Sequence, residues 1–467
     1  MQTKAQWGVA GMGVMGTSLS RNFAQKKIRL ALYNRRIEGT EEEVALKKKQ
    51  QFPELNQALA FEELKGFVAA LELPRKILIM LPAGQPTSLF LEQLIPLLSE
   101  GDVVVDGGNA HFQETEARAK TLRTQGILFI GMGVSGGEEG ALKGPSLMVG
   151  GEQKAYDILQ ADLFKIAAKN KNEAPCCAYF GTGGAGHFVK MVHNGIEYAE
   201  MQLLAEMVAL GRSSLSYEQL QKTLSRWNTT ESKSYLLEIT AALLEYKEGA
   251  TSFVEFIQDS ASNKGTGAWA TAAATQMGYP NTLMAAALHA RYLSFFKKQR
   301  QQYGQRFGGP KSSITVSAEQ LKKAYDLSRW VNHHQGFEML RLAATHYNWS
   351  LNLSQVAAVW AAGCIIKSDL MDACIPLLAN EPSLLDSKEF SQLITDNKEA
   401  WKQTLQQAVA DEIPIPCLQS AWSYFVGIKT EHSSANIIQA QRDYFGAHGF
   451  LRNDRESEDL QHGPWST

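Results

Sequence analysis

The sequence predicts an α/β, Rossmann-like N-terminal domain, then a large all-α domain, then an extended C-terminal tail. Up to about Phe180, short β-rich runs alternate with amphipathic helical patterns, which indicates a parallel sheet with helices on both faces. From His187 to about Ser434, helical periodicity dominates. The segment after Ser434 is polar, aromatic and irregular. The expected divisions are therefore a Rossmann-like domain at 1–180, a helical domain at 181–434 and a tail at 435–467.

Five short apolar runs are the predicted strands of the sheet. They are 7–10, 28–33, 76–81, 103–105 and 127–130. Because helical patterns separate these runs, we expect parallel pairing. The glycine-rich segment 181–186 follows this region and is expected to link the two domains.

The composition limits the possible classes of function. The chain has 467 residues, 44% of them hydrophobic, so it can bury large cores and form two or more domains. Its 46 basic and 48 acidic residues give no electrostatic case for binding nucleic acid or an anionic membrane. The uncharged stretch 265–290 is interrupted by polar residues and Pro280, so a membrane span is not expected. Five cysteines without a disulfide framework or metal-ligand spacing favour a reducing cytoplasm and no metal site.

A Gly-x-Gly-x-x-Gly motif directly follows the first predicted strand. Its glycines permit a tight turn, close approach of the backbone to a pyrophosphate and close packing of the next helix. The motif alone is weak evidence, but its position on a strand–turn–helix indicates a dinucleotide site. The residues expected to bind the cofactor here are Gly11, Met12, Gly13, Val14, Met15 and Gly16.

The second predicted strand is followed by Asn34, Arg35 and Arg36. A dinucleotide with a free ribose 2′-hydroxyl needs Asp or Glu at this place, whereas two arginines suit a 2′-phosphate. The alternative is that the arginines only balance the nearby acidic residues Glu38 and 41–43. The pattern favours NADP as the cofactor.

Three loops follow predicted strands at places where ligands of doubly wound sheets bind. In the third loop, consecutive backbone amides of Ser135, Gly136 and Gly137 can form an anion-binding nest for a carboxylate. Each loop alone is more often only a turn, but together they indicate a site. The loops are 82–86, 106–110 and 134–140.

A polar stripe lies on a predicted helix after the linker. Lys190, His193, Asn194 and Glu197 are spaced i, i+3, i+4 and i+7, so their side chains fall within an arc of about 100°. Their neighbours are apolar, which places the stripe away from solvent and suits acid–base catalysis. The alternative is an exposed Lys–Glu pair beside a packed histidine. Gly195 is expected to let a ligand approach the helix backbone.

Along essentially its whole length, the chain resembles the 6-phosphogluconate dehydrogenase family of NADP-dependent, decarboxylating enzymes. The most specific matches are 190–197 and 442–448. The matching segments are 11–16, 34–35, 106–109, 134–140, 144–148, 186–198, 264–267, Arg291 and 439–448. The resemblance implies 6-phosphogluconate as substrate, and a homodimer in which each tail reaches into the partner subunit.

The resemblance also implies the catalytic roles. Lys190 matches the general base, which takes a proton from the C3 hydroxyl of 6-phosphogluconate as hydride leaves for NADP. After carbon dioxide is lost, Glu197 matches the acid that protonates the enediol to give ribulose 5-phosphate. The residues implied to position substrate and cofactor are Asn109, His193 and Asn194.

The remaining implied contacts concern binding. The substrate carboxylate and hydroxyls are implied to contact Ser135, Gly136 and Gly137. The phosphate end is implied to lie against Tyr198, Lys264, Thr266 and Arg291, with Arg442 and His448 supplied by the tail of the other subunit. The region around Arg442 has few helix-forming features, so we expect an irregular tail that cannot fold on its own. The cofactor set is completed by Asn34, Arg35, Arg36 and Asn109.

Among the positions that depart from the family pattern, three concern the expected cofactor site. Pro82 stands where a lysine is usual, Ala110 replaces a serine, and Arg36 replaces a threonine that touches the 2′-phosphate. Pro82 and Ala110 put cofactor affinity and rate in doubt, and they leave open a cofactor-binding protein that has lost catalysis. A second alternative is a related β-hydroxyacid dehydrogenase, although those enzymes are usually shorter and lack the tail. Intact Lys190 and Glu197 argue for the catalytic reading.

Overall fold

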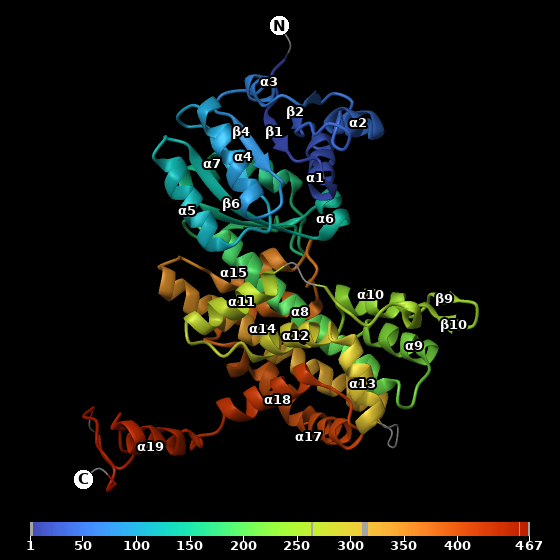
Figure 1. Ribbon diagram of the computed structural model, residues 1–467, viewed down its shortest axis with the longest axis vertical. Coiled ribbons are helices and arrows are strands. Elements are labelled where there is room, and N and C mark those ends of the chain that lie inside the picture. The colour runs from blue at the N-terminus through green and yellow to red at the C-terminus, as the bar shows by residue number, and fades with distance from the viewer. Residues whose placement is uncertain (1–2, 263–264, 311–315, 457, 466–467) are drawn as a thin grey trace.

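The computed structural model describes residues 3–262, 265–310, 316–456 and 458–465 (Figure 1). An α/β domain holds the N-terminal part of the chain and sits against a helical domain. The last helix, α19 (Ala435–Gly446), projects away from the helical domain on the side opposite the sheet (Figure 1). Within the described residues, no helix has the length and apolarity that a membrane span requires.

The α/β domain is built on a sheet in which eight strands of the described residues pair in the order β3-β2-β1-β4-β5-β6-β7-β8. Pairing is parallel except between β6 and β7. The strands are β1 (Trp7–Ala10), β2 (Leu30–Tyr33), β3 (Leu59–Phe61), β4 (Lys76–Ile79), β5 (Val103–Asp106), β6 (Leu128–Ser135), β7 (Ser146–Gly151) and β8 (Cys177–Tyr179).

All five predicted strands form, but the sequence prediction is wrong in three respects. The predicted runs 28–33 and 76–81 are longer than the strands that form there, β2 and β4, and β6 continues to Ser135 instead of ending at 130. Strands β3, β7 and β8 were missed. The expectation of purely parallel pairing fails at β7, because the connection from β6 is shorter than a parallel crossover requires.

Helices cover both faces of the sheet and complete two apolar cores. Leu19, Phe23 and Leu159 belong to the core on one face, whereas Phe67 and Leu91 belong to the core on the other. This is the layering expected of a doubly wound sheet. The helices are α1 (Val14–Gln25), α2 (Val44–Gln51), α3 (Leu64–Ala69), α4 (Gln85–Leu94), α5 (Phe112–Arg123), α6 (Gly137–Lys143) and α7 (Gln153–Ile166).

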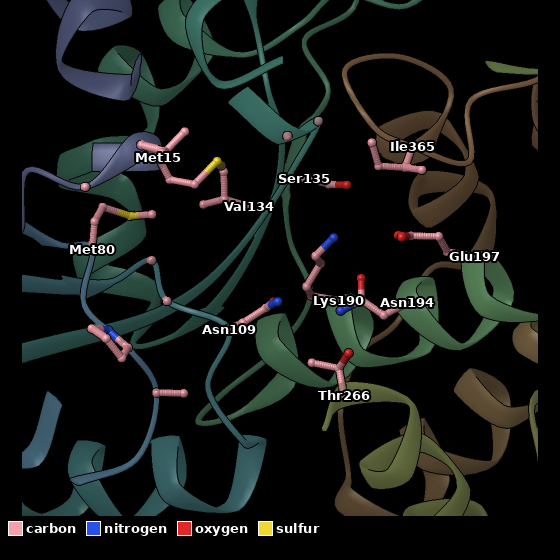
Figure 2. Close-up of a pocket in the computed structure, with 18 of the residues that line it drawn as sticks. Met15, Met80, Asn109, Val134, Ser135, Lys190, Asn194, Glu197, Thr266 and Ile365 are labelled. Atoms are coloured by element: carbon pink, nitrogen blue, oxygen red, sulfur yellow. The ribbon is translucent and has the colours of Figure 1, made fainter. Parts of the chain in front are cut away.

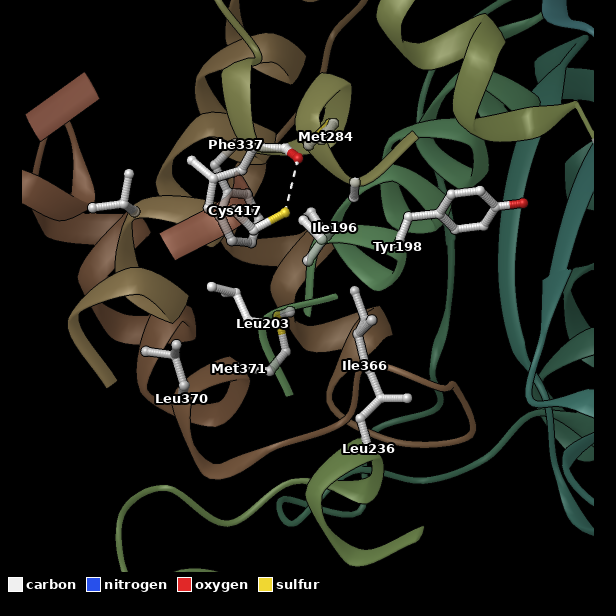
Figure 3. Close-up of a cluster of buried hydrophobic side chains, with 14 of the residues drawn as sticks. Ile196, Tyr198, Leu203, Leu236, Met284, Phe337, Ile366, Leu370, Met371 and Cys417 are labelled. Atoms are coloured by element: carbon white, nitrogen blue, oxygen red, sulfur yellow. Dashed lines mark hydrogen bonds between the residues drawn. The ribbon is translucent and has the colours of Figure 1, made fainter. Parts of the chain in front are cut away.

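The helical domain is organised around α8 (Ala185–Gly211), which contacts β6 and β7 at one end and several helices along its length. Figure 3 shows Ile196 and Leu203 of this helix among buried side chains such as Met284, Phe337 and Met371. The other helices are α9 (Tyr217–Trp227), α10 (Tyr235–Leu243), α11 (Thr266–Gln276), α12 (Thr282–Ser294), α13 (Lys297–Phe307), α14 (Ala318–Tyr347), α15 (Leu353–Trp360), α16 (Asp369–Asn380), α17 (Lys388–Ala410) and α18 (Pro416–Ile428).

Two expectations about this region are corrected. A short hairpin of β9 (Lys247–Glu248) and β10 (Thr251–Ser252) interrupts the helices, although strands were not expected there. Gly195 does not open the helix to a ligand. A Cβ atom at this position would lie 2.6 Å from the sulfur of Met284, so the glycine lets α12 pack closely on α8.

The expectation of an irregular tail is wrong for its first part, because α19 is a regular helix that contains Arg442. Residues with good helix propensity, including Ala440, explain its formation. His448 lies in the loop that follows the helix. After this loop, Phe450 and Gln461 pair in an isolated antiparallel β-bridge.

Candidate functional site

A cleft of about 840 Å³ lies where the two domains meet. Its walls come from the carboxyl ends of β1, β4, β5 and β6, from α8, and from α11 and α12 (Figure 2). The geometry follows from the sheet, since parallel strands present the loops at their carboxyl ends on one edge. The predicted site residues that line this cleft are Gly13, Val14, Met15, Gly16, Asn109, Ser135, Gly136, Gly137, Lys190, Asn194, Glu197, Tyr198, Thr266 and Arg291.

A second cavity, of about 510 Å³, continues from the cleft across the ends of β1 and β2. The two cavities share Gly13, Met80, Leu81 and Pro82 in their linings, so together they form one groove. The predicted cofactor residues that line the second cavity are Gly11, Met12, Gly13, Asn34 and Arg35.

The start of α1 fits a dinucleotide pyrophosphate. Gly13 precedes the first helical residue, no side chain caps this end of the helix, and both cavities reach it. A Cβ atom at Gly13 would meet no atom within 4 Å, so the space beside the amides is open. Asn34 Oδ1 accepts a hydrogen bond of 3.1 Å from the Met12 amide, which fixes the loop against β2. Free amides at a helix N-terminus attract phosphate.

Arg35 and Arg36 follow strand β2 in the sequence. Their side chains are 67% and 63% exposed, and their contacts with Glu41 and Glu42 are long, at 3.5 and 3.4 Å. Such exposed pairs contribute little stability, so balancing acidic neighbours is a weak explanation for the arginines. Arg35 lines the cavity, whereas Arg36 is not among the lining residues.

The polar stripe of α8 is buried, not exposed. Lys190, His193 and Asn194 are only 7%, 0% and 6% exposed. Figure 2 shows Lys190, Asn194 and Glu197 directed from α8 into the cleft, with Asn109 on the facing loop. The alternative of an ion pair on an exposed helix face is therefore excluded.

His193 lies behind the cleft wall and connects three of its residues. Its Nε2 is 3.1 Å from Ser135 Oγ, and its Nδ1 is 3.3 Å from Lys190 Nζ and 3.2 Å from Asn194 Oδ1. Burial lowers the pKa of His193 well below its ordinary value, and the neighbouring Lys190 acts in the same direction. The neutral imidazole of His193 therefore fixes the position of the carboxyl end of β6 relative to the polar stripe of α8.

The electrostatics of Lys190 and Glu197 suit proton transfer. Burial lowers the pKa of Lys190, although Glu197 opposes the shift. Burial also raises the pKa of Glu197, against the effect of Lys190 and Arg291. The amine thus moves toward its neutral, proton-accepting form, and the carboxyl toward its protonated, donating form.

The far end of the cleft is suited to an anion. The Arg291 guanidinium lies 3.5 Å above the ring of Tyr198 and donates to the Ser262 carbonyl at 3.4 Å. Thr266 is the first residue of α11, so its hydroxyl and the helix amides face the same space. Lys264, which was expected here, lies outside the described residues.

Four predicted site residues of the described part of the chain line neither cavity, and one of them is His193, behind the cleft wall. Arg442 and His448 belong to the projecting tail, and Arg36 lies outside both cavity linings. Sequence reasoning missed several apolar lining residues that carry no chemical signal: Met80, Met201, Trp269 and Ile365. In the part of the chain that the structure describes, no three His, Cys, Asp or Glu side chains are arranged as metal ligands.

Comparison with known proteins identifies close relatives of the whole chain. The family model for the NAD binding domain of 6-phosphogluconate dehydrogenase matches residues 6–181, and that for its C-terminal domain matches 186–465. The chain is 40% identical to 6-phosphogluconate dehydrogenase, decarboxylating, of Escherichia coli (strain K12), with 99% of each chain covered. Identity to the protein of that name from Drosophila melanogaster is 38%, covering 100% of this chain and 97% of the other.

A solved structure extends the likeness to three dimensions. Plasmodium falciparum 6-phosphogluconate dehydrogenase superimposes with a TM-score of 0.92 at 32% sequence identity, covering 98% of this chain and 100% of that chain. That protein was solved in its apo form, with its cofactor NADP+ and with its substrate 6-phosphogluconate.

Burial of Lys190 has a measurable cost in stability. Because its pKa is lowered in the folded protein, the unfolded chain binds more protons between that pKa and about 10.4. The loss of stability caused by burying Lys190 is therefore largest at low pH and becomes smaller as pH rises through this window.

Lys190→Met should raise the free energy of unfolding by on the order of 1 kcal/mol at pH 7, and by less at pH 10. Urea unfolding at both pH values tests this, with the exposed Lys154→Met as control; an equal gain at both would contradict it.

Proposed function

Since the chain belongs to the 6-phosphogluconate dehydrogenase family, we propose that it converts 6-phosphogluconate to ribulose 5-phosphate and carbon dioxide while reducing NADP to NADPH, a step of the pentose phosphate pathway. One observation carries the residue assignment. Lys190 and Glu197 are held on one helix with opposite pKa shifts, at a cleft continuous with a dinucleotide groove.

The groove binds NADP through this chain's own backbone and cations. The amides after Gly13 would hold the pyrophosphate, and Arg35 at the cavity, with Arg36 next to it in the sequence, would hold the 2′-phosphate. Asn109 lies at the nicotinamide end of the groove, where it positions substrate and cofactor. NADP, when bound there, accepts the hydride that leaves C3 of the substrate.

Lys190 acts first, as a general base. Its neutral amine takes the proton of the C3 hydroxyl as the C3–H bond breaks, which leaves a 3-keto acid and a protonated lysine. His193 contacts the amine and holds it at the cleft, and Asn194 in turn contacts His193. The next bond to break joins C1 to C2, and carbon dioxide departs.

Decarboxylation moves the bonding electrons of C1–C2 toward the C3 carbonyl oxygen. The protonated Lys190 stabilises the negative charge on that oxygen, and an enediol results. Glu197, whose burial raises its pKa and so favours the protonated form, then donates a proton to the carbon that becomes C1 of ribulose 5-phosphate, while the enediol hydroxyl returns its proton to Lys190. One residue therefore serves oxidation and decarboxylation, and the other serves the final protonation.

Both ends of the substrate have anion-binding groups in the cleft. The amides around Gly136 and Gly137, with the Ser135 hydroxyl, bind the carboxylate end. At the other end, Tyr198 and Arg291 bind the phosphate, together with Thr266.

We also propose a homodimer in which the tail completes the partner's cleft. Exposed apolar side chains on the tail and on the helical domain support this, because such surfaces are normally covered in an assembly. On the tail they are Ile437, Ile438, Tyr444, Phe445, Leu451 and Leu460, and on the domain they include Tyr246, Phe256, Ile257, Phe296 and Phe307. Arg442 and His448 then join the phosphate end.

Two residues that depart from the family pattern, Pro82 and Ala110, change the chemistry of the cofactor site. Pro82 lines both cavities without a charge, so we expect weaker cofactor binding than a lysine there would give. Ala110 is buried and offers no hydroxyl beside Asn109.

All five cysteines are free and buried, which supports the reducing cytoplasm as the place of action.

The catalytic assignment is tested by turnover. Lys190→Ala should lower kcat by at least ~10²-fold, a typical general-base contribution, with a smaller effect on substrate binding. Glu197→Gln should spare part of the oxidation step, so NADPH should form in a single turnover faster than ribulose 5-phosphate. Absorbance of NADPH with 6-phosphogluconate is the measurement, and Lys154→Ala is the matched control. Near-normal turnover in Lys190→Ala would remove α8 from the mechanism.

Cofactor choice is tested at the two arginines. Replacing Arg35 and Arg36 together by Gln should weaken NADP binding by a few kcal/mol, since each charged hydrogen bond contributes about 1.5–3 kcal/mol. Binding of NAD should change little. Titration calorimetry with both cofactors gives the answer, with Arg123→Gln as control because that arginine is equally exposed. An equal loss for NADP and NAD would show that the arginines do not read the 2′-phosphate.

The shared site is tested by mixing two inactive variants. After subunit exchange, a mixed dimer of Lys190→Ala and Arg442→Ala chains has one cleft with both lesions and one with neither. Activity should recover to about half that of a wild-type dimer, by symmetry. Exchange is followed with mass-tagged subunits, and two Lys190→Ala preparations serve as control. Failure to recover despite demonstrated exchange would place the tail in its own chain's cleft.

A further inference from the structure

One buried carboxylate organises the tail. Asp443 is only 1% exposed, although most of α19 around it is open to solvent. Its Oδ1 accepts hydrogen bonds from the Gly449 amide at 2.9 Å and from His462 Nδ1 at 2.7 Å. Its Oδ2 accepts from the Gly463 amide at 2.9 Å and from Trp465 Nε1 at 2.8 Å. A single side chain thus joins the helix, the following loop and the segment 462–465.

The same residue fixes the backbone on both sides of His448. The Ala447 amide donates to the Asp443 carbonyl oxygen at 2.8 Å, and the Gly449 amide donates to the Asp443 carboxylate. Ala447 and Gly449 both have positive φ, of 48° and 70°. A non-glycine residue seldom adopts this conformation, so the loop is held in its shape by these bonds.

Arg442 is connected to the same frame through Gln439. The Arg442 guanidinium donates to Gln439 Oε1 at 3.1 Å, and Gln439 Nε2 donates to the Gly449 carbonyl at 2.5 Å. The two tail residues assigned to the phosphate therefore sit on one hydrogen-bonded unit, although six positions separate them.

We infer that Asp443 is a positioning residue for substrate binding: it sets the mutual placement of His448 and Arg442, so that the tail presents both to the phosphate in the partner's cleft. This inference rests on the proposed shared site. Asp443 does not face the phosphate, because both of its oxygens are directed inward onto four donors. Its negative charge is satisfied within the tail and does not oppose the anion.

The charge state of Asp443 agrees with this role. The Gly463 amide is the largest of the influences that hold the pKa of Asp443 well below its ordinary value, and His462, Gly449 and Trp465 add to it, while burial acts in the opposite direction. The carboxylate is therefore ionised throughout the neutral range and keeps all four acceptor interactions.

Asparagine at this position has nearly the same shape but lacks one acceptor. Whichever way its amide is turned, the NH2 group faces a backbone N–H, that of Gly449 or that of Gly463. Asp443→Asn in the full-length dimer should therefore raise KM for 6-phosphogluconate about tenfold, while kcat and KM for NADP change little. Asp454→Asn is the matched control, because Asp454 lies exposed in the same tail and pairs with exposed Arg452; its KM should equal that of the wild type.

A substrate without the phosphate separates positioning from general damage to the fold. Gluconate lacks the group that the tail binds, so kcat/KM for gluconate should be the same in Asp443→Asn and in the wild type. An unchanged KM for 6-phosphogluconate, or an equal loss with both substrates, would overturn the inference. Should Asp443→Asn fail to give dimers, Trp465→Phe, which removes one donor and leaves the carboxylate, is tested in the same way and should show a smaller rise in KM.

Arg442→Ala and His448→Ala, measured in parallel, separate this inference from the proposal beneath it. A rise of KM in these variants without a rise in Asp443→Asn defeats only the positioning role. An unchanged KM in both Arg442→Ala and His448→Ala would contradict the shared site, and with it the positioning role of Asp443. In the expected case, Asp443→Asn acts on KM only through His448 and Arg442. The double variant Asp443→Asn, His448→Ala should therefore raise KM by no more than His448→Ala and Arg442→Ala do together.

Discussion

The desolvation of Lys190 is the constraint on which the rest of the site depends. An amine on an exposed helix would stay protonated and would form an ion pair of little energy with Glu197. In the cleft, loss of hydration lowers the pKa of Lys190 and raises that of Glu197. The division into an acceptor and a donor is thus a property of the surroundings as much as of the two residue types. The apolar core of the helical domain is what maintains those surroundings.

The position of α8 explains how one pair of residues serves two ligands. The helix starts against β6 and β7, and it continues between α11, α12 and α14. Its first turns are therefore fixed relative to the strand ends that form the dinucleotide groove, and its middle is fixed relative to the anion-binding end of the cleft. His193 adds a direct connection, because it contacts Ser135 of β6 as well as Lys190.

The sequence was sufficient for features that depend on local pattern, and insufficient for features that depend on distant contacts. The glycine motif and the spacing of Lys190 and Glu197 are local signals, and these residues line the cleft and the second cavity. The antiparallel pairing of β7 follows from the short connection between β6 and β7, and not from a local sequence pattern. The contact of Gly195 with Met284, and the four donors around Asp443, join residues that no periodicity relates. Apolar lining residues such as Trp269 have no sequence signal that marks them as part of a site.

The phase of α8 has a consequence for how this chain can change during evolution. Each residue advances an α-helix by about 100° and 1.5 Å. A single insertion or deletion between Lys190 and Glu197 would rotate the carboxyl group out of the cleft, and every individual side chain would still be present. The stretch 190–197 is therefore closed to changes in length even where it tolerates substitution. Length variation must be absorbed instead in surface connections, such as the hairpin of β9 and β10, where a shift of register displaces no reacting group.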